Sequence, residues 1–177
     1  TYILILIGVV ISLLASAKVK STFAKYSKVR SMSGLTGAQA AERILSNAGI
    51  FDVSVQRISG HLTDHYDPKN KVLRLSDSVF GETSVAAIGV AAHECGHAIQ
   101  HSKEYAPLKM RTALVPIANF GATLSWPLIL IGVLLSWSQP LITLGIILFS
   151  AAVLFQLVTL PVEFNASNRA VKILAST

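Results

Sequence analysis

Residues 84–101 read Ser84-Val-Ala-Ala-Ile-Gly-Val-Ala-Ala-His-Glu-Cys-Gly-His-Ala-Ile-Gln-His101, and this stretch decides the fold. It contains no proline and many small residues, which predicts one helix, N-capped by Thr83, that neighbouring helices can approach closely. Because each helical residue turns by about 100°, His93 and His97 lie one turn apart and within about 40° of each other. Both imidazoles can therefore bind one metal ion. The alternative is a polar helix face with two hydrogen-bonded histidines.

Residues 93–97 match the H-E-x-x-H pattern of zinc metalloproteases. Glu94 follows the first histidine, on the flank of the same face. Its carboxylate can reach a metal-bound water without being a ligand itself, which is the position of a general base. The pattern therefore makes a hydrolase the leading interpretation.

The composition is that of a membrane protein. Of 177 residues, 52% are hydrophobic and 14% are charged, whereas about 25% charged is usual for soluble domains. The mean hydropathy is +0.58. Apolar residues concentrate in 2–17, 113–137 and 140–162, and the last two segments are long enough to cross a bilayer as helices. The chain begins with Thr and stops inside an apparently helical stretch, so we expect missing residues at both ends.

The positions of the 15 Lys and Arg residues predict a topology. They all lie between Lys18 and Arg111 or after Glu163. By the positive-inside rule, residues 1–17 form an N-terminal transmembrane anchor, 18–112 a cytoplasmic domain, 113–162 a transmembrane hairpin, and 163–177 a further helix. The first segment is not a cleavable signal peptide, because its positive cluster follows the apolar run. This places a multi-pass protein in the plasma membrane.

The net charge of +6 does not indicate nucleic-acid binding, because the basic residues gather beside apolar segments and form no stripe interleaved with aromatics. The lipid membrane, through its anionic headgroups, is the expected partner. The single cysteine, Cys95, excludes an internal disulfide and is predicted to be buried packing.

The polar region is predicted to form one small domain. Thr36 and Gln39 match a capping box, and Gly49 suits the C-terminus of a helix over 37–48. Alternating residues around Val53, and segments on either side of the turn 67–70, predict a small, at least partly antiparallel β-sheet of about three strands. The fold class is therefore an α-rich membrane protein with a compact, partly β domain.

A catalytic zinc site needs a third protein ligand. His101 lies about 12 Å along the helix axis from His93, too far to share an ion, and Glu104 lies near the end of the same helix. Glu163 is the only acid after Glu104. It lies at the membrane boundary, where an unpaired carboxylate is costly and binding a cation would stabilise it. The structural alternative is a Glu163 that pairs with Arg169 or reaches solvent.

Four blocks carry a resemblance to a known family. They are residues 60–76, 90–100, 105–109 and 160–170. In this order they resemble the YugP-like neutral zinc metallopeptidases of bacterial membranes, which are distantly similar to HtpX-like membrane peptidases. The resemblance implies one zinc ion per chain held by His93, His97 and Glu163. It also implies Glu94 as the catalytic acid/base and a compact gluzincin-like core joined to transmembrane helices.

The HtpX-like third-ligand block ends in Asp, where this chain has Ser167. Asn165, Ser167 or Arg169 could therefore orient a ligand instead. The oxyanion-stabilising donor also stays open among His61, His65, Tyr66 and Tyr105.

Together these features predict a zinc metalloendopeptidase that hydrolyses membrane-associated or unfolded polypeptides at the cytoplasmic membrane surface. One alternative is a non-catalytic, zinc-stabilised membrane scaffold. Another is a small transport subunit that uses Glu163 in an ion pathway, but this leaves His93 and His97 unexplained.

Overall fold

The structure is a computed structural model that describes residues 2–176, so Thr1 of the predicted anchor and Thr177 of the predicted last helix lie outside the described residues. The chain divides into two compact units, residues 1–98 with 170–177 and residues 99–169. Both boundaries fall inside continuous helices, at the end of α4 (Val85–Ser102) and near the end of α6 (Gln139–Ala175).

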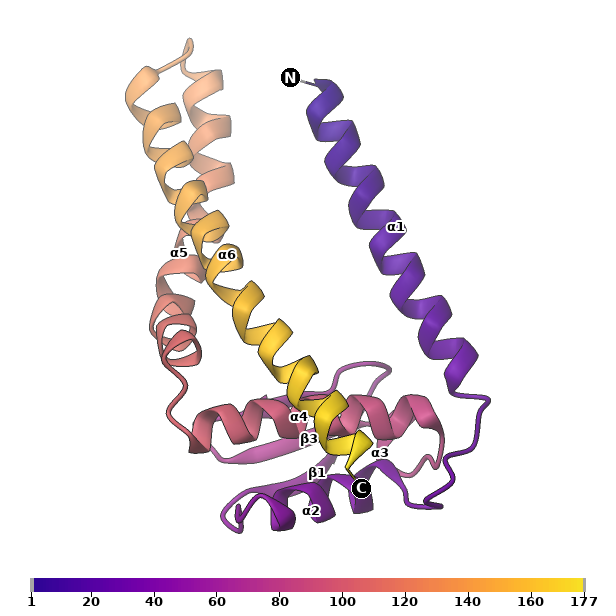
Figure 1. Ribbon diagram of the computed structural model, residues 1–177. Coiled ribbons are helices and arrows are strands. Elements are labelled where there is room, and N and C mark those ends of the chain that lie inside the picture. The colour runs from indigo at the N-terminus through magenta and orange to yellow at the C-terminus, as the bar shows by residue number, and fades with distance from the viewer. Residues whose placement is uncertain (1, 177) are drawn as a thin grey trace. The chain divides into compact units, whose positions relative to one another are not determined.

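The first unit contains a small α/β core and one long helix (Figure 1). Its elements, before the part of α4 that it includes, are α1 (Tyr2–Tyr26), α2 (Gly37–Asn47), β1 (Ser54–Ile58), β2 (His65–Asp67), β3 (Val72–Ser76) and α3 (Asp77–Phe80).

The sheet has three strands in the order β1-β3-β2. β1 runs parallel to β3, with Val55 opposite Leu73, and β2 runs antiparallel to β3, with Tyr66 opposite Leu73. The turn between β2 and β3 is closed by Asp67, whose carboxylate accepts hydrogen bonds from the backbone N–H groups of Lys69 and Asn70. The predicted small, partly antiparallel sheet is therefore confirmed.

Helix α2 begins as predicted. The Thr36 hydroxyl accepts a hydrogen bond from the Gln39 backbone N–H, and the Gln39 side chain accepts one from the Thr36 N–H. After the helix, Gly49 adopts a φ of 73°, which favours glycine. The start of α2 lies against α3, since a Cβ on Gly37 would come 2.3 Å from the Val79 carbonyl oxygen.

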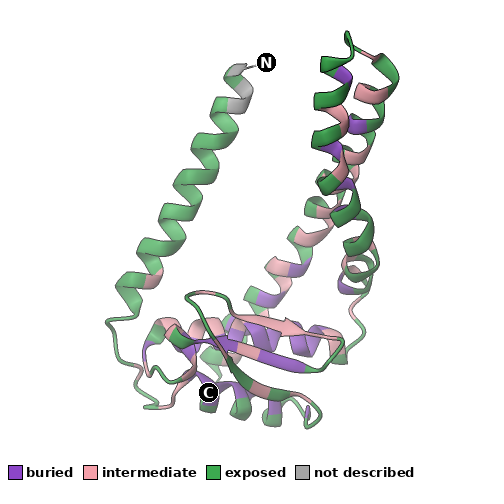
Figure 2. Ribbon diagram, turned by 180° about the vertical axis from the view of Figure 1, so that it is seen from behind, coloured by how far each residue is buried: buried purple, intermediate pink, exposed green. Residues whose placement is uncertain are grey.

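The core of this unit is built from large side chains of β3 and α3 and small side chains of α4. Buried residues are purple in Figure 2. The fully enclosed apolar ones are Leu73, Leu75, Val79, Ala41, Ala87, Ala91, Ala92 and Cys95, each with 0% of its surface exposed. Close packing of this kind stabilises the position of α4, the helix that carries the histidine motif.

The N-terminus of α4 differs from the prediction. The Ser84 hydroxyl, not that of Thr83, accepts the capping hydrogen bond from the Ala87 backbone N–H. Thr83 instead gives its carbonyl to the Ser31 N–H, and Val85 donates its N–H to the Val29 carbonyl. These antiparallel contacts place Ser84 at the cap position, so tertiary pairing selects the capping residue.

Among the described residues, three helices are long and apolar enough, by length and composition, to cross a membrane. They are Leu6–Tyr26 within α1, α5 (Ala106–Leu134) and α6. No residue in the apolar window of α1 is buried among the described residues. Helix α1 continues to Tyr26, beyond the predicted end of the anchor at residue 17, because the lysines at 18, 20 and 25 do not interrupt a helix.

In the second unit, α5 and α6 form an antiparallel hairpin joined by residues 135–138. Small residues of the hairpin allow close backbone approach. A Cβ on Gly121 would lie 2.6 Å from the Leu148 carbonyl oxygen, and one on Gly145 would lie 3.0 Å from the Ser125 carbonyl oxygen. Helix α6 runs without interruption through residue 163, so the second arm of the hairpin and the predicted third-ligand segment are one helix.

Gly121→Ala is expected to lower the free energy of unfolding by about 1–3 kcal/mol, because the added methyl group meets a backbone oxygen that cannot rotate away. The midpoint of unfolding in mixed micelles measures the effect. Gly8→Ala in α1 is the matched control, since nothing lies within 4 Å of its Cβ position. The control should be neutral or slightly stabilising, because alanine is the better helix former. Equal effects of the two substitutions would contradict the close packing of α5 on α6.

Asp67 is expected to make the fold sensitive to acid. Hydrogen bonds from Asn70, Arg74 and the Lys69 N–H hold the pKa of its carboxyl well below the usual range. A carboxyl with a lowered pKa in the folded state stabilises the fold fully above its unfolded pKa of about 3.9, and this contribution is lost at lower pH.

Asp67→Asn should therefore lower the thermal unfolding midpoint at neutral pH, and its difference from the unmodified chain should shrink below about pH 4. Glu42→Gln, at an exposed site on α2, is the control. A difference that stays constant down to pH 3 would show that the Asp67 charge is not involved.

Candidate metal centre

Helix α4 carries the three residues of the motif on one side. His93 is half-buried, whereas Glu94 and His97 are each only 8% exposed. The two imidazole rings are 4.8 Å apart between centroids and perpendicular, in an edge-to-face arrangement. The helical spacing therefore brings the two rings together as expected.

The end of α4 is tied to α6 by a residue that the sequence analysis did not single out. Gln100, one turn after His97, is completely buried. Its side-chain amide nitrogen donates to the Val162 carbonyl oxygen at 2.8 Å and to Asn165 Oδ1 at 3.0 Å. A buried amide needs such partners, because an unsatisfied one costs about 1–3 kcal/mol. Its role could have been suspected from the sequence, because a glutamine stands out in a helix that is otherwise rich in small and apolar residues.

Asn165 is held from two sides. Besides the bond from Gln100, its Oδ1 accepts a hydrogen bond of 2.7 Å from Nε of Arg169. Two of the three residues predicted as possible orienting groups, Asn165 and Arg169, thus hold the Gln100 amide in place. They fix the turn of α6 that carries Glu163.

Glu163 is half-buried on α6, between Val162 and Asn165. One ligand-type atom each from His93, His97 and Glu163 lies within 4.8 Å of the others. Among the described residues, the analogous atoms of His101 and Glu104 are not part of this group. Glu104 forms an ion pair of 3.1 Å with Lys109.

The donor set fits zinc. Imidazole nitrogens and carboxylate oxygens are the donors that zinc takes in catalytic sites. Two imidazoles and one carboxylate leave a fourth position open, as in catalytic zinc sites.

Cys95 lies inside the motif but takes no part in it. It is fully buried and its thiol contacts the Ala41 carbonyl oxygen at 3.6 Å. Burial, with a smaller contribution from the charge of Glu94, raises the pKa of the Cys95 thiol well above its usual value. The expectation of a packing role is consistent with both findings.

The four predicted oxyanion donors lie in different settings. The His61 ring packs edge-on against Phe23 of α1, with centroids 5.3 Å apart. His65 uses Nδ1 with the Thr63 carbonyl at 2.9 Å and has Nε2 3.4 Å from Arg74. Tyr66 is half-buried in β2, and burial, followed by the charges of two aspartates, raises its pKa to about 12. Tyr105 precedes α5.

Comparison with known proteins gives the family. The family described as "Putative neutral zinc metallopeptidase" matches residues 1–177. The chain belongs to this family. A curated relative in Bacillus subtilis (strain 168), described as "Putative membrane protease YugP", is 54% identical over 166 residues, which cover 94% of this chain and 73% of the relative. No solved structure matches the chain.

Membership confirms the resemblance drawn from the sequence blocks. The family is described by its use of zinc. Two imidazoles and one carboxylate, the side chains of His93, His97 and Glu163, are ligands that suit this metal. The roles of individual residues stay predictions.

Gln100→Leu should loosen the turn of α6 around Asn165, because it removes the donor of two hydrogen bonds and leaves their acceptors buried. Hydrogen–deuterium exchange of the amides of residues 162–169 should rise by about tenfold, equivalent to a loss of roughly 1–3 kcal/mol. The control is Gln156→Leu, at an exposed position of the same helix. Unchanged exchange in the Gln100 variant would contradict its anchoring role.

Proposed function

We propose that this chain is a membrane-embedded zinc metalloendopeptidase that cleaves membrane-associated or unfolded polypeptides. The observation that carries the proposal is the approach of His93, His97 and Glu163 to within 4.8 Å of one another through their ligand-type atoms. Family membership supports it, since the family is described by zinc and peptidase activity.

In this proposal His93, His97 and Glu163 hold one zinc ion. An ion held by them would polarise a peptide carbonyl and lower the pKa of water from about 15.7 to about 7. His93 and Glu163 are each half-buried, and His97 is buried.

Glu94 acts as the general base. It follows His93 on α4, and it is 92% shielded from solvent, with 8% of its surface exposed. Its carboxylate accepts a proton from the attacking water and passes that proton to the nitrogen of the leaving amine. Because Glu94 gives up the same proton that it accepted, its carboxylate is ionised again at the end of the cycle.

The oxyanion that develops on the peptide carbonyl needs a hydrogen-bond donor. Tyr66 and Tyr105 can supply a phenol hydroxyl. A phenol hydroxyl is protonated at physiological pH even at its ordinary pKa of about 10. His65 is less suited, because its Nδ1 is bonded to the Thr63 carbonyl.

We place the centre at the cytoplasmic side of the bacterial plasma membrane. Support comes from three apolar helices and from the name of the relative, a membrane protease. The Lys and Arg residues gather in the polar region that carries α4, as the positive-inside rule requires of a cytoplasmic region. Polypeptides that emerge from or lie against the membrane are then the accessible substrates.

Glu94→Gln should lower the rate of peptide hydrolysis by at least about 100-fold, because it removes the general base. Zinc binding should be kept, because Glu94 is not a ligand. Glu163→Gln should instead lower the zinc content, since it weakens a ligand. Cleavage of casein and zinc analysis by mass spectrometry, on protein purified in detergent, measure both. Glu104→Gln, at an exposed acid, is the control.

About one zinc per unmodified chain is expected. Hydrolysis that survives in the zinc-loaded Glu94→Gln protein would reject the general-base mechanism. Stoichiometric zinc with no hydrolysis of any polypeptide by the unmodified chain would favour the metal-stabilised scaffold instead.

A further inference from the structure

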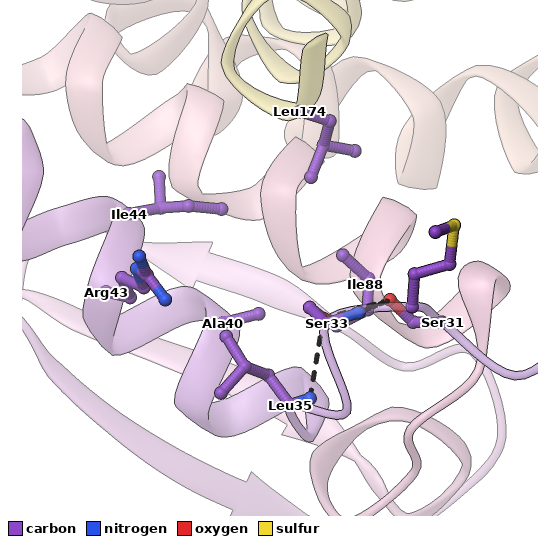
Figure 3. Close-up of a pocket in the computed structure, with 9 residues that line it drawn as sticks. Ser31, Ser33, Leu35, Ala40, Arg43, Ile44, Ile88 and Leu174 are labelled. Atoms are coloured by element: carbon purple, nitrogen blue, oxygen red, sulfur yellow. Dashed lines mark hydrogen bonds between the residues drawn. The ribbon is translucent and has the colours of Figure 1, made fainter. Parts of the chain in front are cut away.

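A pocket of about 490 Å³ lies within the first unit, between the segment before α2, α2 itself, α4 and the end of α6 (Figure 3). Its volume falls in the range of small-molecule sites, about 300–1,000 Å³. The buried part of the wall is formed by Ala40, Ile44 and Ile88, and Leu35 and Leu174 extend the apolar lining toward the surface.

This pocket does not belong to the proposed metal centre. Its contact with α4 is Ile88, five residues before His93 and nine before His97. At about 100° per residue, Ile88 points about 140° away from His93 and about 180° away from His97. The pocket and the histidines therefore use opposite faces of one helix.

One charged side chain lines the pocket. Arg43 of α2 forms no ion pair or side-chain hydrogen bond among the described residues, whereas Arg57, Lys71 and Arg74 are each paired with an aspartate. A guanidinium offers a planar fork of donors that suits a carboxylate. An unpaired arginine beside an apolar wall is thus complementary to an anion with an apolar tail.

Polar groups line the pocket, and positive charge lies close to them in the sequence. Ser31 and Ser33 line the pocket, and their hydroxyls are hydrogen-bonded to each other at 2.9 Å. Lys28 and Arg30 come just before them, and no Asp or Glu occurs before Glu42. This part of the chain therefore attracts anions over a distance comparable to the Debye length, about 8–10 Å.

We propose that this pocket binds a fatty acid, with the carboxylate at Arg43 and the alkyl chain along Ile44, Ile88 and Leu174. A single apolar pocket with one arginine suits one chain with one anionic head. The segment that leads into the pocket follows α1, a candidate membrane span that ends at Tyr26, and a membrane is where such amphiphiles partition. The proposal is independent of the peptidase activity.

The test uses decanoic acid that carries a photoreactive diazirine at the alkyl end, away from the carboxylate. It is added to the full chain in nanodiscs of zwitterionic phosphatidylcholine. Mass spectrometry should find crosslinks within residues 31–44 and at residue 88. Unlabelled decanoate should remove them. Decanol, which lacks the charge, and acetate, which lacks the chain, should each need at least about tenfold higher concentration, since a charged hydrogen bond or several buried methylenes are then missing.

Arg43→Gln should weaken competition by decanoate about tenfold or more, and Leu174→Trp should block labelling by filling the pocket. Both positions are exposed enough to tolerate change, with Leu174 40% exposed. Lys69→Gln, at an exposed cation outside the pocket, is the control. Crosslinks confined to α1, α5 and the apolar part of α6, or no effect of Arg43→Gln, would overturn the proposal. So would decyl phosphate competing better than decanoate, which would identify a phosphate head as the occupant.

Discussion

The side-chain amide of Gln100 donates two hydrogen bonds to a helix that lies more than 60 residues further along the chain. The Val162 carbonyl and the Asn165 side chain accept them, and Arg169 fixes Asn165 from the other side. Gln100 is fully buried, so water cannot reach its amide. If these partners were lost, the amide would have no hydrogen bond, which is costly. The bonds therefore set the rotation and height of α6 against the end of α4. Any chemistry that needs His97 on one helix and Glu163 on the other depends on that setting, as metal ligands tolerate errors of only a few tenths of an ångström.

The apolar hairpin adds a second constraint on the same helix. Gly121 and Gly145 let α5 and α6 approach so closely that a methyl group at either position would meet backbone oxygen atoms. In a lipid environment, such packing of small residues replaces the hydrophobic effect as the source of helix association. Helix α6 continues from this hairpin to Ala175, so the close packing on α5 and the Glu163 turn belong to one helix. Pro161 lies inside α6, two residues before Glu163, and has no backbone N–H to donate to the helix. The next residue, Val162, accepts a hydrogen bond from Gln100 through its carbonyl oxygen.

Much of this arrangement could be predicted from local sequence. The motif helix, the Thr36 capping box and the mixed sheet follow from patterns that act over a few residues. Glu163 was predicted as a ligand because it is the only acid after Glu104. The Ser84 cap and the Gln100 anchor could not be found in this way, since both depend on partners far away in the sequence. The predicted boundary after residue 162 marks the end of an apolar run. A helix end depends instead on backbone hydrogen bonds, and these continue through Glu163.

Helix α4 has neighbours on two opposite faces, which explains its composition. One face carries His93 and His97, and the opposite face places Cys95 against the Ala41 carbonyl of α2 and presents Ile88 to the pocket beside Arg43. At about 100° per residue, Cys95 and Ile88 point within about 20° of each other and about 140–180° away from the histidines, so the two faces do not compete for space. Large side chains would push the neighbours apart, whereas alanine and glycine at the intervening positions keep them in contact. Substitutions at these small residues would therefore move the histidines and the pocket together, which couples the two sites through packing alone.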